Sequence, residues 1–477
     1  MSDISRETIM PHTYARLTRK TIAELATIVG AENIVTAKSE LEQYASDEAP
    51  LAISHTPQAV VRPVDTGAVS RLLTFAHQKR IPVTPRGAGT GLSGGCVPLY
   101  DGIVLSLERM NRILAIDEDN FVAIVEPGVT LAQLCDEVER RGLYYPLHPG
   151  EMTATIGGNV ATNAGGMNAV KYGVTRHHVL GLEAVLPNGD IINTGGEFVK
   201  CSTGYDLTQL LVGSEGTLAV ITKVILKLST RPARKEILFI PFTNLQDAID
   251  AVPEILKLES VPQGLEFMEK GIIDIVEKYL GKELPYHDYE ASLLLITEGE
   301  SADEIHDYFA RVENIARRHG AIDAMIPGSE RARRRLLDAR EKFYHAIKRF
   351  APMEIADVVV PRSEIARFIR RVKEISAEHQ VPVVAYGHAG DGNVHLHPIC
   401  VNMTKDEWSR RLPELMAEIY RAGVSFRGAI SGEHGIGYDK KAYLPLQMDR
   451  SLLRTLKAIK QAFDPDNILN PGKIFDL

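Results

Sequence analysis

Residues 85–95 read PRGAGTGLSGG, and the surroundings of this loop decide the fold. The loop matches the GxGxxG pattern of dinucleotide-binding sites, which must follow a strand and open a helix. A strand candidate, IPVT, precedes it, but the next segment, VPLYDGIVLSLERM, is typical of a strand and not of a helix. A Rossmann site is therefore excluded. The glycines still allow main-chain N–H groups to converge on an anion such as a pyrophosphate, helped by Arg86, Thr90 and Ser93. A tight structural turn is the alternative.

Two further glycine-rich blocks follow this loop. Residues 148–173 read HPGEMTATIGGNVATNAGGMNAVKYG, and residues 213–222 read GSEGTLAVIT. Small and polar residues separate the glycine pairs of the first block, so its main-chain amides can pack closely against a flat polar ring. We therefore expect a ring-binding surface in addition to the anion-binding loop.

A second chemical centre is indicated in the last quarter of the chain. Residues 386–398 read YGHAGDGNVHLHP, where a Gly-Asp-Gly turn between two apolar runs predicts a hairpin. His388 would end the first strand and His395 begin the second, so the two would lie close across the turn. His397 shares a face with His395, because side chains alternate along a strand. Its role is open between a substrate contact and a supporting position.

The segment SGEHGIG, at residues 431–437, completes this centre. Its glycines flank Glu433 and His434, so the backbone can approach a site closely. Two imidazoles and a carboxylate suit a catalytic divalent metal with open positions, and a histidine outside the coordination sphere can serve as a base. A structural role for each histidine is the alternative.

The composition limits the class of protein. The chain has 477 residues, of which 44% are hydrophobic and 24% charged, as in a globular protein with more than one core. The 54 basic and 62 acidic residues give a net charge of −8, which argues against a nucleic-acid binder. The four cysteines are far apart, which argues against a disulfide framework and a cysteine-ligated cluster. We see no signal peptide and no apolar run of membrane length, so we expect a cytoplasmic protein.

The three glycine-rich blocks together resemble those of the vanillyl-alcohol-oxidase type of flavoproteins, which have the p-cresol-methylhydroxylase fold. The resemblance implies an α+β fold in which the first loop binds the pyrophosphate of FAD and the later blocks contact its ring and ribityl chain. Members with covalently attached flavin carry a histidine in the first loop, and this loop has none, so non-covalent FAD is expected. The implied FAD-binding residues are Pro85, Arg86, Gly87, Ala88, Gly89, Thr90, Gly91, Leu92, Ser93, Gly150, Ile156, Gly157, Gly158, Asn159, Thr162, Gly165, Gly166, Tyr172, Glu215, Gly216 and Asn470.

The histidine motifs, together with the ending FDPDNILNPGKIF, resemble the C-terminal half of FAD-dependent 2-hydroxy-acid dehydrogenases. This group includes D-lactate dehydrogenases, the glycolate oxidase flavin subunit and D-2-hydroxyglutarate dehydrogenase. The resemblance covers the chain from about Tyr44 to Phe475 and implies a divalent metal: zinc, iron(II) or manganese. The implied metal ligands are His388, His395 and Glu433, the implied base is His434, and the implied partner of the substrate carboxylate is Arg340.

The distribution of glycines, β-branched residues and helical periodicity along the chain agrees with this resemblance. Glycine loops and β-branched runs dominate the first half, and helical periodicity alternates with short strands beyond about Arg231. We expect an N-terminal helical segment at residues 1–54 and an FAD-binding domain at 55–232. An α+β, ferredoxin-like substrate or cap domain follows at 233–420, and a C-terminal helical segment at 421–477 completes the flavin and metal site.

The implied reaction is the oxidation of a D-2-hydroxy acid to the 2-oxo acid. The metal would hold the substrate, His434 would take the hydroxyl proton, and a hydride would pass to flavin N5. Enzymes of 2-hydroxyglutarate grip the distal carboxylate with a threonine and a lysine, whereas Tyr344 and Ile355 occupy the aligned positions here. An apolar Ile355 favours D-lactate, then glycolate or a longer D-2-hydroxy acid.

The electrons must reach an external acceptor, because the chain has no cysteine set for its own cluster. Relatives use electron-transfer flavoprotein, an iron–sulfur subunit, a quinone or a cytochrome, and many are homodimers. Three alternatives stay open. They are a flavin-containing electron-transfer subunit without chemistry of its own, a metal-dependent hydrolase, and an ether-lipid synthase of the same fold.

Overall fold

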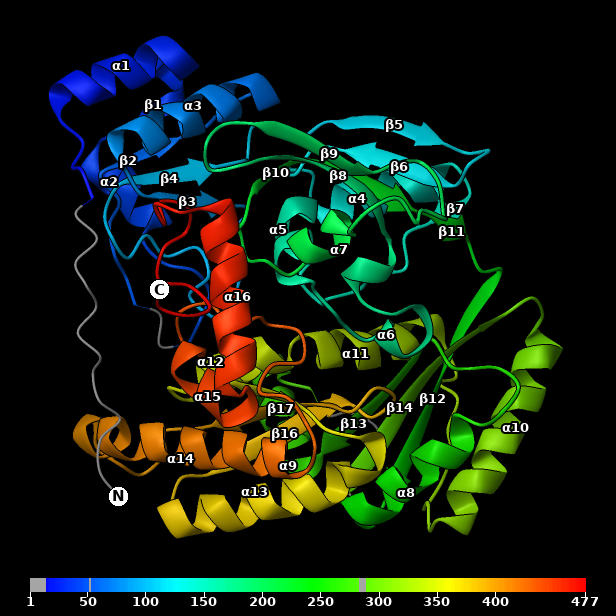
Figure 1. The fold of residues 1–477 in the computed structure, drawn as a ribbon. Coiled ribbons are helices and arrows are strands. Elements are labelled where there is room, and N and C mark those ends of the chain that lie inside the picture. Colours follow the sequence, from blue (N-terminus) through cyan, green and yellow to red (C-terminus); the bar gives the residue numbers. More distant parts are fainter. Residues whose placement is uncertain (1–13, 51–52, 283–288) are drawn as a thin grey trace.

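The computed structural model describes residues 14–50, 53–282 and 289–477, and in this part of the chain the strands form four sheets. The first half of the chain builds a four-stranded sheet of order β1-β2-β4-β3 and a five-stranded sheet of order β5-β6-β10-β8-β9 (Figure 1). Its helices and strands are α1 (Arg19–Val29), β1 (Ile34–Val35), α2 (Lys38–Leu41), β2 (Ala59–Val61), α3 (Thr66–Lys79), β3 (Val83–Arg86), β4 (Ile103–Ser106), β5 (Ile113–Asp117), β6 (Val122–Val125), α4 (Leu131–Arg140), β7 (Leu143–Tyr144), α5 (Ile156–Thr162), α6 (Ala169–Tyr172), β8 (Val179–Val185), β9 (Ile191–Gly195), α7 (Leu207–Leu211), β10 (Val220–Lys227) and β11 (Ser229–Thr230).

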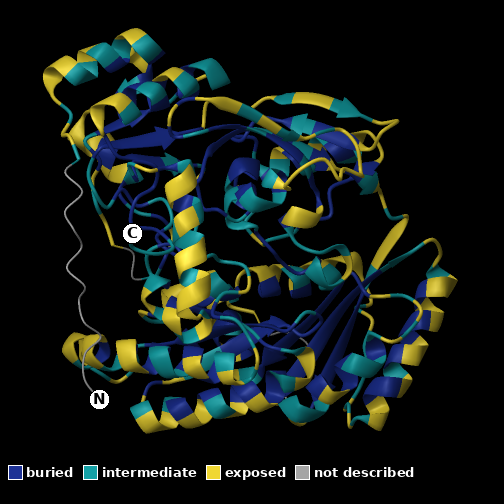
Figure 2. Ribbon diagram, viewed as in Figure 1, coloured by how far each residue is buried: buried dark blue, intermediate teal, exposed yellow. Residues whose placement is uncertain are grey.

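The second half builds a six-stranded antiparallel sheet of order β12-β14-β13-β16-β17-β15, with helices packed on it (Figure 1). Figure 2 shows that its strands are buried except at the exposed start of β12, whereas the surrounding helices expose one face each. The elements are β12 (Arg234–Phe242), α8 (Leu245–Ile255), β13 (Gly264–Glu269), α9 (Lys270–Leu280), β14 (Ala291–Gly299), α10 (Ala302–Arg318), α11 (Glu330–Glu341), α12 (Phe343–Phe350), β15 (Ala356–Val359), α13 (Ile365–His379), β16 (Val383–His388), β17 (Asn393–Pro398), α14 (Lys405–Ser425), α15 (Leu444–Gln447) and α16 (Arg450–Phe463).

The loop at residues 87–102 sits in the context that the sequence predicts. Helix α3 begins after Asp65, whose carboxylate accepts the N–H of Ala68 at 2.7 Å and so caps the helix. Strand β3 follows the helix, and the chain then enters β4, a strand that pairs in parallel with β3. The glycine loop therefore joins two strands and opens no helix, which confirms that it is not a Rossmann loop.

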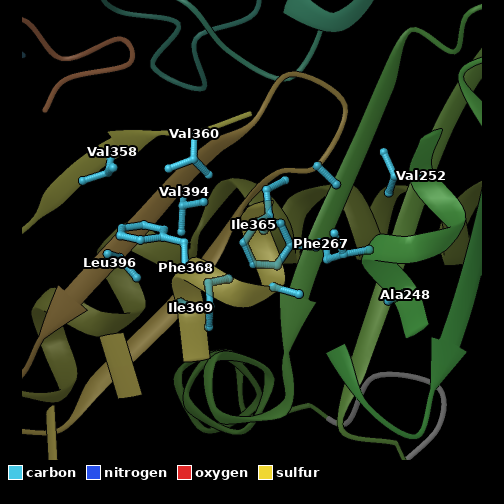
Figure 3. Packing of buried hydrophobic residues seen from close by; sticks show 14 of the residues in the cluster. Ala248, Val252, Phe267, Val358, Val360, Ile365, Phe368, Ile369, Val394 and Leu396 are labelled. Carbon is cyan, nitrogen blue, oxygen red and sulfur yellow. The ribbon is translucent and has the colours of Figure 1, made fainter. Parts of the chain in front are cut away.

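The six-stranded sheet has two chemically different faces, because side chains alternate along each strand. The apolar side chains of β13, β15 and β17 on one face pack against Ile365, Phe368 and Ile369 of α13 (Figure 3). Burial of each such side chain contributes about 1.5–3 kcal/mol. The opposite face carries the polar and aromatic residues Glu266, Asp357, Tyr386, His388, His395 and His397 at alternate positions of β13, β15, β16 and β17.

The C-terminal segment returns from the six-stranded sheet to the first half of the chain. Leu469 forms a parallel bridge with Val83 of β3. On α16 the buried ammonium of Lys460 pairs with Asp464 and donates to the carbonyl oxygens of Thr217, at 2.7 Å, and Leu469, at 2.8 Å. The last residues therefore fix the glycine loop that begins at the end of β3. Among the described residues, none of the helices has the length and apolarity needed to cross a membrane.

Candidate active site

A cavity lies between the loop that follows β3 and the N-terminal end of α5. The predicted loop and the two later blocks form its walls, so residues far apart in the sequence meet there. The predicted residues that line it are Pro85, Arg86, Gly87, Ala88, Gly89, Thr90, Gly91, Leu92, Ser93, Gly157, Gly158, Asn159, Thr162, Gly165, Glu215 and Gly216.

The walls of this cavity require glycine and present an unpaired donor. A Cβ at Gly87 would lie 2.3 Å from Oγ1 of Thr155, the residue that caps α5, so only glycine lets the loop pass so close to the helix. The Nδ2 of Asn159 is buried with no hydrogen-bond partner among the described residues. A ligand with acceptor atoms, such as the FAD ring, would satisfy this donor, so the cavity fits FAD.

Two predicted anion-binding side chains make other contacts. The Arg86 guanidinium donates to the carbonyl oxygen of Ser46 at 2.8 Å and lies over the Tyr44 ring, 5.6 Å from its centroid. Its side chain therefore anchors the N-terminal segment beneath the loop. The Ser93 hydroxyl donates to the carbonyl oxygen of His434 at 3.0 Å and joins the glycine loop to the SGEHGIG turn. The expectation that these two groups help to bind an anion finds no support in these contacts.

Five predicted FAD-binding residues do not line this cavity. Gly150 and Gly166 line a second cavity described below, and the other three make contacts elsewhere. Ile156 is fully buried in the core beneath α5, and the Tyr172 hydroxyl donates to Glu298. The Nδ2 of Asn470 donates to the carbonyl oxygens of Gly95, at 3.0 Å, and Glu215, at 2.7 Å. Asn470 therefore holds two cavity-lining segments in place and does not itself line the cavity.

A second cavity adjoins the first at Thr90, Leu92, Glu433 and His434, which line both. Its outer wall comes from α11, α12 and the polar face of the six-stranded sheet. The remaining lining residues that the sequence analysis named are Gly150, Gly166, Arg340, Tyr344, Ile355, His388 and His395. The two predicted centres, one rich in glycine and one rich in histidine, thus form a continuous site.

Three side-chain atoms converge at the edge of this second cavity. The Nε2 atoms of His388 and His395 lie 3.3 Å apart, and Oε1 of Glu433 lies 3.6 and 3.4 Å from them. Metal–ligand bonds of about 2.1 Å at a tetrahedral angle place ligand atoms about 3.4 Å apart. The donor set and its spacing therefore fit a divalent metal such as zinc. A glycine is required beside it, because a Cβ at Gly165 would lie 2.6 Å from Oε2 of Glu433.

Two of these groups, His395 and Glu433, have protonation states that suit metal binding. Burial lowers the pKa of His395 to about 3, so its imidazole is neutral, which is the form that binds a metal. Burial opposes ionisation of Glu433, but the nearby His388 lowers the pKa of this carboxyl to about 2. The cluster thus presents a carboxylate and a neutral imidazole to a cation at neutral pH. Burial opposes protonation of His388, but the Glu266 carboxylate raises the pKa of that ring well above its ordinary value, so a metal must displace a proton from it.

The sequence analysis missed two buried carboxylates, which lie on the strands that pair with those of the histidines. Glu266 is opposite His388 in the pairing of β13 with β16, and Asp357 is opposite His395 in the pairing of β15 with β17. His388 Nδ1 donates to the Glu266 carboxylate at 2.7 and 2.9 Å, which leaves its Nε2 free as a ligand. The same carboxylate accepts a hydrogen bond from Arg340 Nε at 2.8 Å. Glu266 therefore connects the predicted substrate arginine to a predicted metal ligand.

Asp357 organises the SGEHGIG turn. Its Oδ2 accepts the main-chain N–H groups of Gly432, Glu433 and His434, each at 2.9 Å. Burial opposes its ionisation, but His434 and Lys440 hold the pKa of Asp357 well below its usual range. Asp357, His395, Glu433 and His434 have potential ligand atoms within 4.8 Å of one another. Because Oδ2 is occupied by three N–H groups, Asp357 orients the turn that carries Glu433 and His434.

His434 faces both cavities. Its ring stacks on that of His395 at 5.4 Å between centroids, and its Nε2 lies 3.8 Å from Oε1 of Glu433. Burial lowers the pKa of His434 below its ordinary value. The imidazole is therefore neutral at pH 7 and able to accept a proton.

Comparison with known proteins identifies the two halves of the chain. A family model described as an FAD binding domain matches residues 57–195, and one described as the C-terminal domain of FAD linked oxidases matches residues 231–474. The chain is 44% identical to D-lactate dehydrogenase of Archaeoglobus fulgidus, over 91% of this chain and 95% of that protein. It is 39% identical to glycolate oxidase subunit GlcD of Bacillus subtilis, over 96% and 97%.

Solved structures agree on the fold. The chain superposes on p-cresol methylhydroxylase with a TM-score of 0.79 at 18% identity, covering 96% of each chain. It superposes on alkyldihydroxyacetonephosphate synthase with a TM-score of 0.75 at 18% identity, covering 96% of this chain and 86% of the other. The chain therefore belongs to the family of FAD-linked oxidases with the p-cresol-methylhydroxylase fold, and it is an FAD-dependent oxidoreductase that acts on a CH–OH group.

Proposed function

We propose that the protein is a metal-assisted D-2-hydroxy-acid dehydrogenase that converts D-lactate to pyruvate and passes the electrons to an external carrier. One observation carries this proposal. The cluster of His388, His395, Glu433 and His434 lies where the glycine-lined cavity meets a second cavity that contains a buried arginine. A small anionic substrate bound there contacts the metal ligands on one side and the FAD site on the other.

The chain's own residues have distinct tasks in this reaction. His388, His395 and Glu433 hold the metal, which when bound is a Lewis acid that makes a hydroxyl group more acidic. His434 is the base that accepts the hydroxyl proton, since its neutral imidazole lies beside this cluster. The glycine-lined cavity would hold FAD non-covalently, and the bound flavin would supply the two-electron acceptor for the hydride from the substrate.

The substrate class follows from the walls of the second cavity. Arg340 is 7% exposed and lines this wall, in contrast to the exposed arginines that precede it on α11, so its charge is placed for a carboxylate. Ile355 and the ring of Tyr344 provide no second positive charge. This composition favours an acid with one carboxylate and a short apolar side chain, with glycolate and longer D-2-hydroxy acids as weaker substrates. The names of the relatives, D-lactate dehydrogenase and glycolate oxidase subunit, support the same class.

Steady-state turnover with an artificial dye as electron acceptor tests this proposal. The purified holoenzyme should oxidise D-lactate faster than glycolate and should leave L-lactate and D-2-hydroxyglutarate nearly unused. Equal rates for the two lactate enantiomers would contradict the stereochemical assignment. Faster oxidation of D-2-hydroxyglutarate than of D-lactate would contradict the role given to Ile355.

A further inference from the structure

Tyr386 and His397 form a buried pair on the polar face of the six-stranded sheet. His397 is fully buried and lines neither cavity, whereas Tyr386 lines the second cavity beside Arg340. The two rings stack at 14° with centroids 5.3 Å apart, and His397 Nε2 lies 3.2 Å from the Tyr386 hydroxyl. The histidine therefore does not face the cavity itself. It packs against two cavity-lining rings, Tyr386 and Tyr344, the latter with centroids 6.3 Å apart, and its hydrogen bond goes to Tyr386.

The burial of His397 decides which of its nitrogens carries the proton. An imidazole with one N–H carries it on either nitrogen, and the two nitrogens of His397 differ in their hydrogen-bond partners. Its Nδ1 is buried with no hydrogen-bond partner among the described residues. A proton on Nδ1 would leave a buried donor unpaired, which proteins avoid more strictly than an unpaired acceptor. The proton therefore lies on Nε2, and Nε2–H donates to the Tyr386 oxygen.

This hydrogen bond sets the direction of the tyrosine hydroxyl. Because the oxygen of Tyr386 accepts from His397, its own O–H is free to donate elsewhere. The guanidinium of Arg340 lies over the Tyr386 ring, 4.8 Å from the centroid, so the cation and the hydroxyl belong to the same wall of the cavity. Arg340 already donates a hydrogen bond to Glu266. A substrate carboxylate can accept more hydrogen bonds than the remaining N–H groups of this guanidinium supply, so it has room for a second donor.

We propose that Tyr386 donates a hydrogen bond to the substrate carboxylate beside Arg340, and that His397 is the positioning residue that orients this donor. The proposal rests on the proposed function, because it places a 2-hydroxy acid in the second cavity. It gives His397 a supporting role, in which it never touches the substrate.

Binding of a substrate analogue that cannot react tests the proposal apart from turnover. We choose 2-hydroxy-2-methylpropanoate, which has no hydrogen on C2, and calorimetric titration of the holoenzyme. Loss of a hydrogen bond to a charged group weakens binding about 10-fold to 100-fold. Tyr386→Phe should therefore raise the Kd of the analogue, and the KM for D-lactate, by this factor, with a smaller change in kcat. His397→Leu should produce the same loss.

Two further variants distinguish orientation from packing. His397→Gln places an amide N–H near the position of Nε2 and should restore most of the affinity. The double variant Tyr386→Phe/His397→Leu should bind no more weakly than Tyr386→Phe alone, because both changes remove one interaction. Tyr308→Phe is the control, since that hydroxyl is buried in the same sheet domain with no hydrogen-bond partner in the described part of the chain and lies outside both cavities.

The outcomes separate the two proposals. A wild-type protein that oxidises D-lactate, combined with analogue binding that is unchanged in Tyr386→Phe, would overturn the inference and leave the proposed function standing. Additive losses in the double variant would also overturn it, since His397 would then act independently of the tyrosine. If His397→Leu does not fold, the isosteric Tyr386→Phe variant and His397→Gln still decide the question.

Discussion

The connection between Arg340 and His388 through Glu266 leads to the sharpest prediction about the metal site. The Glu266 side chain is fully buried, and its carboxylate accepts hydrogen bonds from His388 Nδ1 at 2.7 Å and Arg340 Nε at 2.8 Å. Glu266→Gln keeps the shape of the side chain but removes the negative charge. It also presents an NH2 group to one of two donors, so one hydrogen bond is lost.

Two magnitudes follow from this geometry. Removal of one partner from a buried ion pair costs about 3–5 kcal/mol, because Arg340 keeps its charge in a buried position. Loss of the carboxylate that orients a histidine ligand weakens metal binding about 10-fold to 100-fold. We therefore expect the variant to lose both unfolding free energy and metal affinity, although Glu266 contacts neither the metal nor the substrate.

Urea unfolding and chelator competition with elemental analysis measure these two effects. Glu269→Gln is the matched control, because Glu269 lies on the same strand and pairs with the exposed Lys373, away from the site. The control should lose less unfolding free energy than Glu266→Gln, because Lys373 is exposed and stays hydrated when its partner is removed, and it should retain wild-type metal affinity. Metal affinity in Glu266→Gln within threefold of the wild type would refute the reasoning.

Three further predictions test separate parts of the account. His434→Ala should lower kcat about 10²–10⁴-fold while absorbance at the flavin band shows that FAD stays bound; near-normal turnover would remove the base assignment. Dialysis of the holoenzyme against a strong chelator should abolish turnover but retain the flavin spectrum, and added zinc, manganese or iron(II) should restore activity; full turnover without metal would exclude the metal role. Burial lowers the pKa of His178 to about 4, so the unfolded chain binds a proton between pH 6.5 and 4 that the folded chain does not. As the pH is lowered from 6.5 to 4, the free energy of unfolding measured in urea should decrease by up to roughly 3 kcal/mol more in the wild type than in His178→Asn. Equal pH dependence of the unfolding free energy in the two proteins would contradict this prediction.

The parts of the site that lie close together in the sequence could be predicted from it. The hairpin that carries His388 and His395 has both its turn and its ligands within a few residues, and the structure forms it as expected. The glycine loop was likewise recognisable, because the absence of a following helix is a local property of the sequence.

The supporting carboxylates could not be assigned to the site from the sequence. Glu266 and Asp357 meet the histidines only through the order and register of β13, β15, β16 and β17, which no local pattern specifies. A signal was nevertheless present. Glu266 and Asp357 each lie between apolar residues of a strand segment, GLEFME and IADVVV, and a charge in a buried strand requires a partner.

The contacts of Arg86 show another limit of sequence reasoning. A basic residue at the start of a glycine-rich loop suggests an anion contact, but the carbonyl oxygen of Ser46 lies within 2.8 Å of its guanidinium. Main-chain acceptors leave no pattern in a sequence, since every residue has one. Such contacts become visible only when the packing of the N-terminal segment is known.

The anaerobic visible spectrum of the purified protein tests the central claim most directly. The account predicts that D-lactate bleaches the flavin band near ~450 nm, and that D-lactate deuterated at C2 bleaches it more slowly. L-lactate should leave the spectrum unchanged. A yellow, metal-loaded protein whose flavin is bleached by none of D-lactate, glycolate and D-2-hydroxyglutarate would contradict the claim that the two cavities form one site for 2-hydroxy-acid oxidation.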